Sequence, residues 1–453
     1  MNRYISISLF YVITYYCAIN EIAEIYALML IVMVIFQFSS FENSIYILSL
    51  ALLIPFFDTT PILGSEKLTL ERIAFFPFLL QLSNKIQIRK FNMNKKNSFN
   101  FLISAVILVA FFSILQIIFD INQYEYFTPF RLLGFIIDII IVLFFFYGVF
   151  GKMNNKSIDK VFDMFLFILI LEGISILLLI IYNPNYLYST LGPEVRVYSI
   201  ERNLYFGTRN VWGILFSLIF VITFIRFQMR KRKNIDLLNI LMMIISLTIT
   251  VVSLSRRAYF LCLIGIGIAF LMQRNFKPII FAGLIALVIF LLPTDFLYLR
   301  VESMLLARSF EDLRYASSGT ISYEATEQFL NNITIIPNAL SGRTYERNLS
   351  ESLWSGILYR QGVLGLLFQF IVLFLIYRKY NAKLTIRAND LQVHVVLMKL
   401  IIIIFFIMGF ITSGCYFINF IGYIQQIGII TLFLFFYSEL MIFKYENNKL
   451  SYL

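Results

Sequence analysis

Residues Met164 to Tyr182 read MFLFILILEGISILLLIIY, and residues Phe101 to Phe119 read FLISAVILVAFFSILQIIF. Both runs are apolar almost throughout, and Glu172 is the one charged residue in the first. A helix needs about 20 such residues to cross the hydrocarbon core of a bilayer, so each run is long enough to span it. A lipid-facing β-barrel would alternate apolar and polar residues instead. The two runs therefore predict an all-α, polytopic integral membrane protein.

The composition of the chain agrees with this class. Its 453 residues are 60% hydrophobic and only 14% charged, and they are expected to form a single transmembrane domain over 1–453. The formal charge of +11 is attributed to basic loops on the cytoplasmic side of a membrane, so no nucleic-acid partner is expected. The three cysteines, Cys17, Cys262 and Cys415, have no pair-like spacing. No metal-ligand spacing or nucleotide-binding glycine motif occurs, so neither a metal nor a cofactor is expected.

The apolar runs and the residues between them predict about fourteen helices. The first is interpreted as a membrane span and not as a cleaved signal, because no small-residue cleavage site follows it. The predicted helices are 5–18, 22–38, 43–57, 68–83, 100–120, 130–150, 161–182, 210–227, 236–253, 257–273, 277–293, 353–377, 392–413 and 418–441.

The connections between these helices separate by charge. Lys and Arg gather in five loops that share one side with both termini, which the positive-inside rule identifies as the cytoplasm. These loops are 84–99, 151–160, 228–235, 274–276 and 378–391. The other side has two long loops, 183–209 and 294–352. Apolar residues at helical spacing in 296–306 and 321–330 predict short helices at the outer membrane surface.

From residue 120 onward, every basic residue assigned to the outer side is an arginine. A guanidinium is a rigid planar fork that binds phosphate or carboxylate through two hydrogen bonds, which the ammonium of lysine does not do. The arginines indicate that the outer face handles an anionic group. They are Arg131, Arg196, Arg202, Arg209, Arg256, Arg257, Arg300, Arg308, Arg314, Arg343 and Arg347.

Two arginine-bearing segments precede predicted helices. Residues 196–210 read RVYSIERNLYFGTRN, where arginines interleaved with tyrosines and asparagines suit a phosphate next to sugars. Residues 253–257 read SLSRR, a connection so short that Arg256 and Arg257 must lie at the mouth of two adjacent helices. Charges at that depth tend to face a cavity or a partner. The alternatives are a polar loop at the lipid headgroups for the first segment and snorkelling for the second.

A third segment, 342–352, reads GRTYERNLSES and precedes the helix predicted at 353–377. Glu351 is a candidate base for a sugar hydroxyl, although neighbouring cations would weaken it, and it could equally complement the helix dipole. Arg360 follows within the helix, and Gly362 and Gly365 are interpreted as helix-packing residues.

Three further polar residues lie within predicted helices. The single histidine, His394, is assigned a packing or helix-end role. Glu172 is either an intramembrane functional residue or a partner of Lys399, and both alternatives stay open.

The pattern resembles the bacterial O-antigen polymerase family, within the superfamily that also contains the O-antigen ligases. The resemblance lies in the many spans, the dominant outer loop late in the chain and three short patterns. These are RNLYFGTRN at 202–210, SRRA at 255–258, and Glu351-Ser352 followed by YRQGVLG at 359–365. Gly319-Thr320 stands where many relatives have Gly-Arg, which leaves Arg314 or Arg343 as the replacement.

The resemblance implies a fold like that of GT-C type glycosyltransferases in a bacterial inner membrane, active on the periplasmic face. It implies a polymerase that joins oligosaccharide repeat units linked to undecaprenyl pyrophosphate, inverting and metal-independent, in lipopolysaccharide or related polysaccharide biosynthesis. Donor glycan, acceptor glycan and membrane lipid are the partners, and a chain-length regulator protein is a further candidate.

The resemblance also assigns roles to residues. Arg202 and Arg256 would bind the donor pyrophosphate, with Glu351 as the base or as a residue that orients the acceptor. The substrate-binding candidates are Arg196, Arg209, Arg257, Arg314, Arg343, Arg360, Tyr205 and Asn210.

Two alternatives remain open at this point. One is an O-antigen ligase, which is disfavoured because Glu351-Ser352 stands where ligases carry a histidine. The other is a lipid-linked oligosaccharide flippase, which is disfavoured because the chain shows no internal repeat.

Overall fold

A computed structural model describes the chain in the following residues, and the regular secondary structure within them is all helical. They are 3–20, 22–53, 70–84, 107, 111, 114, 115, 118, 129–153, 155–182, 209–229, 237–253, 255–273, 335–336, 353–381, 389–409 and 428–439.

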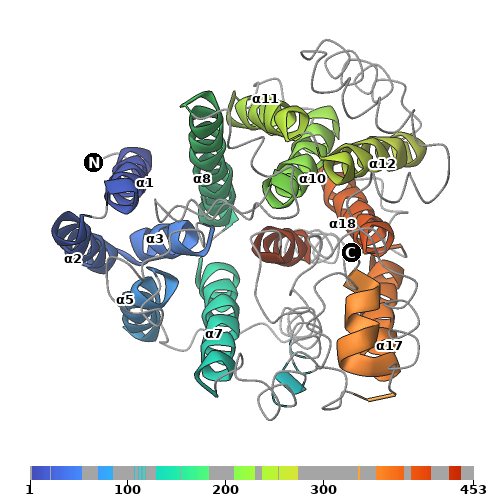
Figure 1. Cartoon of the computed structure of the whole chain (residues 1–453), viewed down its shortest axis with the longest axis horizontal. Helices are drawn as coiled ribbons and strands as arrows, with labels where there is room; N and C mark the ends of the chain where they lie inside the picture. Colours follow the sequence, from blue (N-terminus) through green and yellow to red (C-terminus); the bar gives the residue numbers. More distant parts are fainter. Residues whose placement is uncertain are drawn as a thin grey trace, which may run out of the picture.

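The helices agree closely with the apolar runs of the sequence (Figure 1). Their bounds are α1 Arg3–Asn20, α2 Ala23–Ser39, α3 Phe41–Leu53, α5 Leu70–Asn84, α7 Pro129–Lys152, α8 Asn155–Tyr182, α10 Arg209–Met229, α11 Leu237–Val252, α12 Arg256–Gln273, α17 Leu353–Asn381 and α18 Asn389–Met408. A further apolar helix, Gly428–Glu439, is called the C-terminal helix below. The predicted helix 277–293 and the amphipathic stretches 296–306 and 321–330 lie outside the described residues, and the helix at 100–120 is described only at scattered positions.

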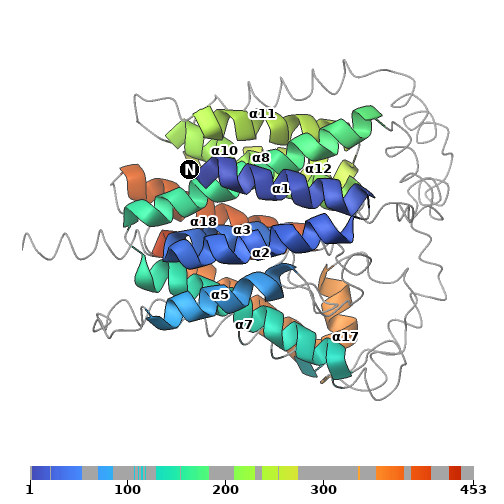
Figure 2. The ribbon, with the colours of Figure 1, turned by 90° about the vertical axis from the view of Figure 1, so that its left-hand side faces the viewer.

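The helices form two groups around α7 and α8. Helices α1, α2, α3 and α5 lie on one side, and α10, α11, α12, α17 and α18 lie on the other (Figure 1). Most of the axes run side by side, as Figure 2 shows. Helix α3 packs against α5, α7 and α8, while α10 packs against α11, α12 and α18. Helix α8 joins the groups because it contacts both α3 and α11.

The C-terminal helix is buried along its whole described length. Its aromatic side chains pack against those of the two central helices. Phe436 lies on Phe146 of α7 with 4.9 Å between ring centroids, and Phe433 lies on Phe165 of α8 at 4.6 Å. Such aromatic pairs add about 0.5–1.5 kcal/mol each beyond their area burial, so they help to hold this helix against α7 and α8.

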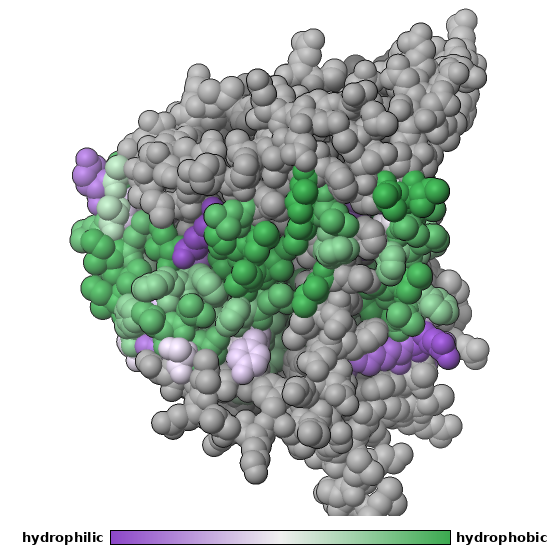
Figure 3. Space-filling view, turned by 90° about the horizontal axis from the view of Figure 1, so that it is seen from below, coloured by the Kyte–Doolittle hydropathy of each residue, from purple (hydrophilic) through white to green (hydrophobic). Residues whose placement is uncertain are grey.

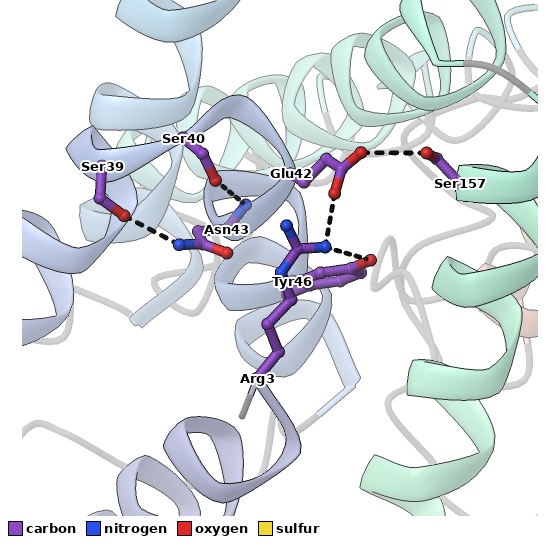
Figure 4. A network of polar contacts seen from close by, with 7 residues as sticks. All are labelled: Arg3, Ser39, Ser40, Glu42, Asn43, Tyr46 and Ser157. Atoms are coloured by element: carbon purple, nitrogen blue, oxygen red, sulfur yellow. Dashed lines mark hydrogen bonds and ion pairs between the residues drawn. The ribbon is translucent and has the colours of Figure 1, made fainter. Parts of the chain in front are cut away.

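Three helices begin together at one end of the bundle, here called the Arg3 end (Figure 4). The guanidinium of Arg3, in α1, pairs with the carboxylate of Glu42 in α3 and donates to the Tyr46 hydroxyl at 3.3 Å. Ser157, in the first turns of α8, donates to the other oxygen of Glu42 at 3.0 Å. Ser40 is the single residue between α2 and α3. Its hydroxyl caps α3 by accepting a hydrogen bond from the N–H of Asn43 at 3.1 Å.

The same end receives the ends of α17 and the C-terminal helix. Glu439, 1% exposed, accepts a hydrogen bond from the Tyr380 hydroxyl at 2.7 Å and pairs with Lys379 at 2.6 Å. The hydroxyl of Tyr437 donates to Asp159, near the start of α8. A carboxylate this deeply buried is stable only when paired, so these contacts hold the three helices together.

Contacts at the Arg3 end also show which helix ends lie at the opposite end of the bundle, here called the Arg257 end. Helix α10 reaches the Arg3 end with its last residues, because the guanidinium of Arg226 lies 4.0 Å from the centre of the Phe162 ring. Helix α18 begins there, because the His394 ring contacts Tyr437 with 5.0 Å between centroids. The start of α10 and the end of α18 therefore lie at the Arg257 end, as does the turn from α11 to α12.

The outer surface of the helices is apolar. Among the described residues, two helical segments, Ser157–Ile181 and Gln361–Asn381, are long and apolar enough to cross a membrane. The described side chains on the face shown in Figure 3 are mostly hydrophobic. Helix α1 exposes Ile5, Leu9 and Val12, which recur at helical spacing. These surfaces suit a lipid environment.

Candidate anion-binding site at the Arg257 end

The start of α10 carries the first part of the candidate site. Arg209 and Asn210 are the first two residues of the helix. Trp212 follows in the same turn and is 1% exposed. Its indole N–H has no hydrogen-bond partner among the described residues. A buried donor without a partner costs about 1–3 kcal/mol, so a native fold keeps one only for a reason.

The start of α12 carries the second part. Ser253 donates to the carbonyl of Thr250 at 2.6 Å and accepts the N–H of Ser255 at 3.2 Å, which closes the turn between α11 and α12. Ser255 precedes Arg256, the first residue of α12, and so stands at the position where a side chain usually caps the helix. Its hydroxyl is buried and has no partner within the described part of the chain.

A close contact between helices brings the two parts together. A Cβ added to Gly213 of α10 would lie 2.7 Å from the hydroxyl oxygen of Ser253 and 3.4 Å from the Cβ of Ala258. Gly213 is one turn from Arg209, and Ala258 directly follows Arg257. The starts of α10 and α12 are therefore neighbours, and Arg209, Asn210, Arg256 and Arg257 share one region.

The start of α17 lies at the same end of the bundle. The main-chain N–H of Trp354 donates to the carbonyl of Gly409 at 3.1 Å, and its indole N–H donates to the carbonyl of Phe406 at 2.9 Å. Phe406 lies in the last turn of α18 and Gly409 directly follows this helix, which also packs against α10 and α12. Glu351 is two residues before Leu353, where α17 begins.

These helix starts share one electrostatic character. The first N–H groups of a helix lack intrahelical partners and carry a partial positive charge, which makes a helix start a natural anion site. Here two adjacent starts have arginines in their first turns and lie beside a buried hydroxyl and a buried indole N–H. Guanidinium, hydroxyl and indole groups can all donate hydrogen bonds. The arrangement is suited to a multivalent anion.

Several residues proposed from the sequence cannot be placed. Arg360 lies in α17, and the structure describes its main chain but not its side chain; the same holds for Arg209, Asn210 and Arg256. The remaining candidates lie outside the described residues. They are Arg196, Arg202, Tyr205, Arg314, Arg343 and Glu351.

Gly362 has a backbone conformation that the helix-packing interpretation did not predict. Its backbone angles, φ 75° and ψ −179°, interrupt α17. Only glycine adopts such angles without strain, so this residue marks a break in the helix.

The structure gives Glu172 and Lys399 separate surroundings. Glu172, 1% exposed, lies within electrostatic range of the Tyr11 hydroxyl, which itself donates to Ser175 at 2.9 Å. Lys399 donates to the side-chain oxygen of Asn381 at 2.6 Å and lies over the ring of Tyr377. Glu172 therefore belongs to the contact between α1 and α8, and Lys399 to the contact between α17 and α18.

The carboxylates of the Arg3 end had not been singled out from the sequence. Glu42 and Glu439 each lie beside a helix end, and that position was the available signal. Among the described residues, no three His, Cys, Asp or Glu side chains are grouped so as to hold a metal ion.

Comparison of the chain with protein-family models, with curated proteins and with solved structures finds no significant match.

Proposed function

We propose that this protein is a membrane-embedded polysaccharide polymerase of the O-antigen polymerase type. It would join oligosaccharide repeat units carried on undecaprenyl pyrophosphate. The observation that carries the proposal is the meeting of the starts of α10 and α12. Arginines occupy the first turns of both helices, and the buried donors of Trp212 and Ser255, which have no partner among the described residues, lie beside them, a combination suited to a pyrophosphate.

The proposed topology has about fourteen spans, with the Arg3 end in the cytoplasm and the Arg257 end in the periplasm. The basic loops support this orientation. The loop 378–391 connects the end of α17 to the start of α18, and both lie at the Arg3 end. The loop 228–235 follows α10, which also ends there. A lipid carrier embedded in the bilayer would present its pyrophosphate at the surface of the membrane, where α10 and α12 begin.

The chemistry proposed for the site is an inverting displacement. A hydroxyl of the acceptor sugar attacks the anomeric carbon of the donor, and the bond from that carbon to the pyrophosphate oxygen breaks. The pyrophosphate leaves with the bonding electron pair, and a base accepts the hydroxyl proton. Arginine forks and helix-start N–H groups stabilise the charge that develops on the leaving oxygen. Glu351 is the proposed base because it lies two residues before the start of α17 in the sequence.

Deleting the gene and separating the surface polysaccharide by size tests this function. If the protein is a polymerase, the deletion strain should lose long polysaccharide chains and keep lipid A core that bears a single repeat unit. Loss of every attached repeat would indicate a ligase or a flippase instead. An unchanged ladder of chain lengths would overturn the proposal.

A further inference from the structure

The break in α17 leaves main-chain donors for another segment to bind. At the start of any helical segment the first N–H groups lose their partners in the preceding turn. After Gly362 one of them, the N–H of Leu364, donates to the carbonyl of Ile335 at 3.0 Å. Ile335 belongs to the long loop 294–352. A piece of that loop is thus bound to α17 by main-chain atoms at the break.

The loop residues at this contact are apolar and largely exposed to solvent. Ile335 is 70% exposed and Ile336 is 57% exposed. Helix α17 exposes an apolar row that begins at the break and continues at helical spacing through Leu364, Leu367, Phe368, Ile371 and Leu375. Because Leu364 itself binds Ile335, the two isoleucines extend this row from the helix onto the loop.

We propose that residues 335–336, the loop strap, dock at the break of α17 and lie among the acyl chains of the bilayer. The proposal rests on the membrane-embedded part of the proposed function, because acyl chains can cover the strap only where α17 spans. Two observations favour lipid as the occupant. The apolar row continues along Gln361–Asn381, a segment long and apolar enough to cross a membrane. The strap carbonyl that faces α17 is hydrogen-bonded, as an apolar medium requires.

The strap gives the break a purpose beyond bending the helix. A continuous helix would use the N–H of Leu364 internally, and Ile335 would have no donor to bind. The conformation of Gly362 therefore permits the loop to be fixed to the helix that carries Arg360. The strap anchors the loop in the membrane beside the proposed site.

Fluorescence quenching in vesicles tests the strap. In the full chain with Cys17, Cys262 and Cys415 replaced by alanine, Ile336→Cys is labelled with an environment-sensitive fluorophore. The protein is reconstituted into phosphatidylcholine and phosphatidylglycerol vesicles. Lipids brominated in their acyl chains should remove more than half of the fluorescence, whereas aqueous iodide should remove little. Quenching by iodide and not by brominated lipid would overturn the proposal.

A second label separates the strap from the membrane embedding of α17. Leu367→Cys, on the exposed row of the helix, should be quenched by brominated lipid in the same vesicles. If Leu367 is quenched and Ile336 is not, the strap proposal fails and the embedding stands. If neither is quenched, the embedding of α17 fails as well.

The role of the break is tested with a glycine variant. Gly362→Ala strains the backbone at φ 75° and should shift the Ile336 label toward iodide quenching, while the Leu367 label stays in lipid. Gly267→Ala is the control, because a Cβ at that helical position meets nothing within 4 Å. A Gly362→Ala protein whose Ile336 label remained in lipid would show that the break is not needed for docking.

Discussion

Gly213 of α10 lies against Ser253 in the turn between α11 and α12, so closely that a Cβ would come within 2.7 Å of the serine hydroxyl oxygen. Both partners of this contact are buried, and Ser253 itself closes the turn that precedes Arg256. The absence of a side chain at one residue thus sets the distance between two arginine-bearing helix starts.

Gly213→Ala should therefore separate α10 from α12. Overpacking of this kind costs about 1–3 kcal/mol. The variant should unfold at a lower temperature in detergent and lose polymer formation in a complemented deletion strain. Gly267→Ala, on an open face of α12, should leave both properties near the wild type. Normal polymer length in Gly213→Ala would show that the spacing of the two starts does not matter to activity.

Arg256→Lys and Arg257→Lys test the guanidinium forks directly. Both substitutions keep the charge but remove the planar pair of donors, and a hydrogen bond to a charged group is worth about 1.5–3 kcal/mol. Each should lower the rate of chain extension by about 10–100-fold. Arg202→Lys should do the same if that residue joins the site.

Arg378→Lys, at the exposed end of α17, is the matched control and should retain the wild-type rate. The rates are compared from the length distribution of surface polysaccharide at equal protein levels. Full chain extension in both Arg256→Lys and Arg257→Lys would show that these guanidinium groups do not bind the pyrophosphate.

The helices could be predicted from the sequence because each is an apolar run bounded by charged or turn-forming residues. For example, only a short polar segment separates the apolar runs of α11 and α12. This segment predicts a tight turn after residue 253 and a helix that begins near Arg256. The sequence predicts that Arg209 and Arg256 lie on the same side of the membrane, but it does not predict that they are neighbours. Gly213 supplies the actual contact, and nothing local in the sequence marks it.

Long-range polar pairs could not be predicted for the same reason. Arg3, Glu42 and Ser157 belong to three helices far apart in the chain, and only the packing of α1, α3 and α8 brings them together. Gly362 shows a different limit. A Gly-x-x-Gly pattern in an apolar helix suits close packing as well as it suits a positive φ, and only the backbone distinguishes the two.

The buried pair of Glu439 with Lys379 predicts an asymmetric response to substitution. Lys379→Met leaves a carboxylate that is 1% exposed without its cation, at a cost of about 3–5 kcal/mol. Glu439→Gln should cost less, because the Lys379 side chain is 23% exposed and can reach water. The double variant should be more stable than Lys379→Met alone.

Thermal unfolding in detergent measures the order of the three variants. Arg3→Met provides the contrast, because the side chains of Arg3 and Glu42 are 38% and 32% exposed and such pairs contribute about 0–1 kcal/mol. If Lys379→Met and Arg3→Met lower the unfolding temperature equally, burial does not govern the strength of these ion pairs.

The two tryptophans of the chain form a matched pair for separating stability from function. Trp354 donates its indole N–H to the Phe406 carbonyl, whereas Trp212 has no such partner among the described residues. Replacing either by phenylalanine removes the N–H and leaves a similar cavity. Trp354→Phe also orphans a carbonyl and should be less stable than Trp212→Phe by about 1 kcal/mol.

Activity should follow the opposite order. If the Trp212 N–H donates to the pyrophosphate, Trp212→Phe should slow chain extension by about tenfold while the protein stays folded, since a hydrogen bond to a charged group is worth about 1.5–3 kcal/mol. Trp354→Phe should retain extension in proportion to the folded protein present. Unfolding temperature and polysaccharide length, measured on both variants, check the two orders together. A Trp212→Phe protein with wild-type extension would leave the buried indole outside the site.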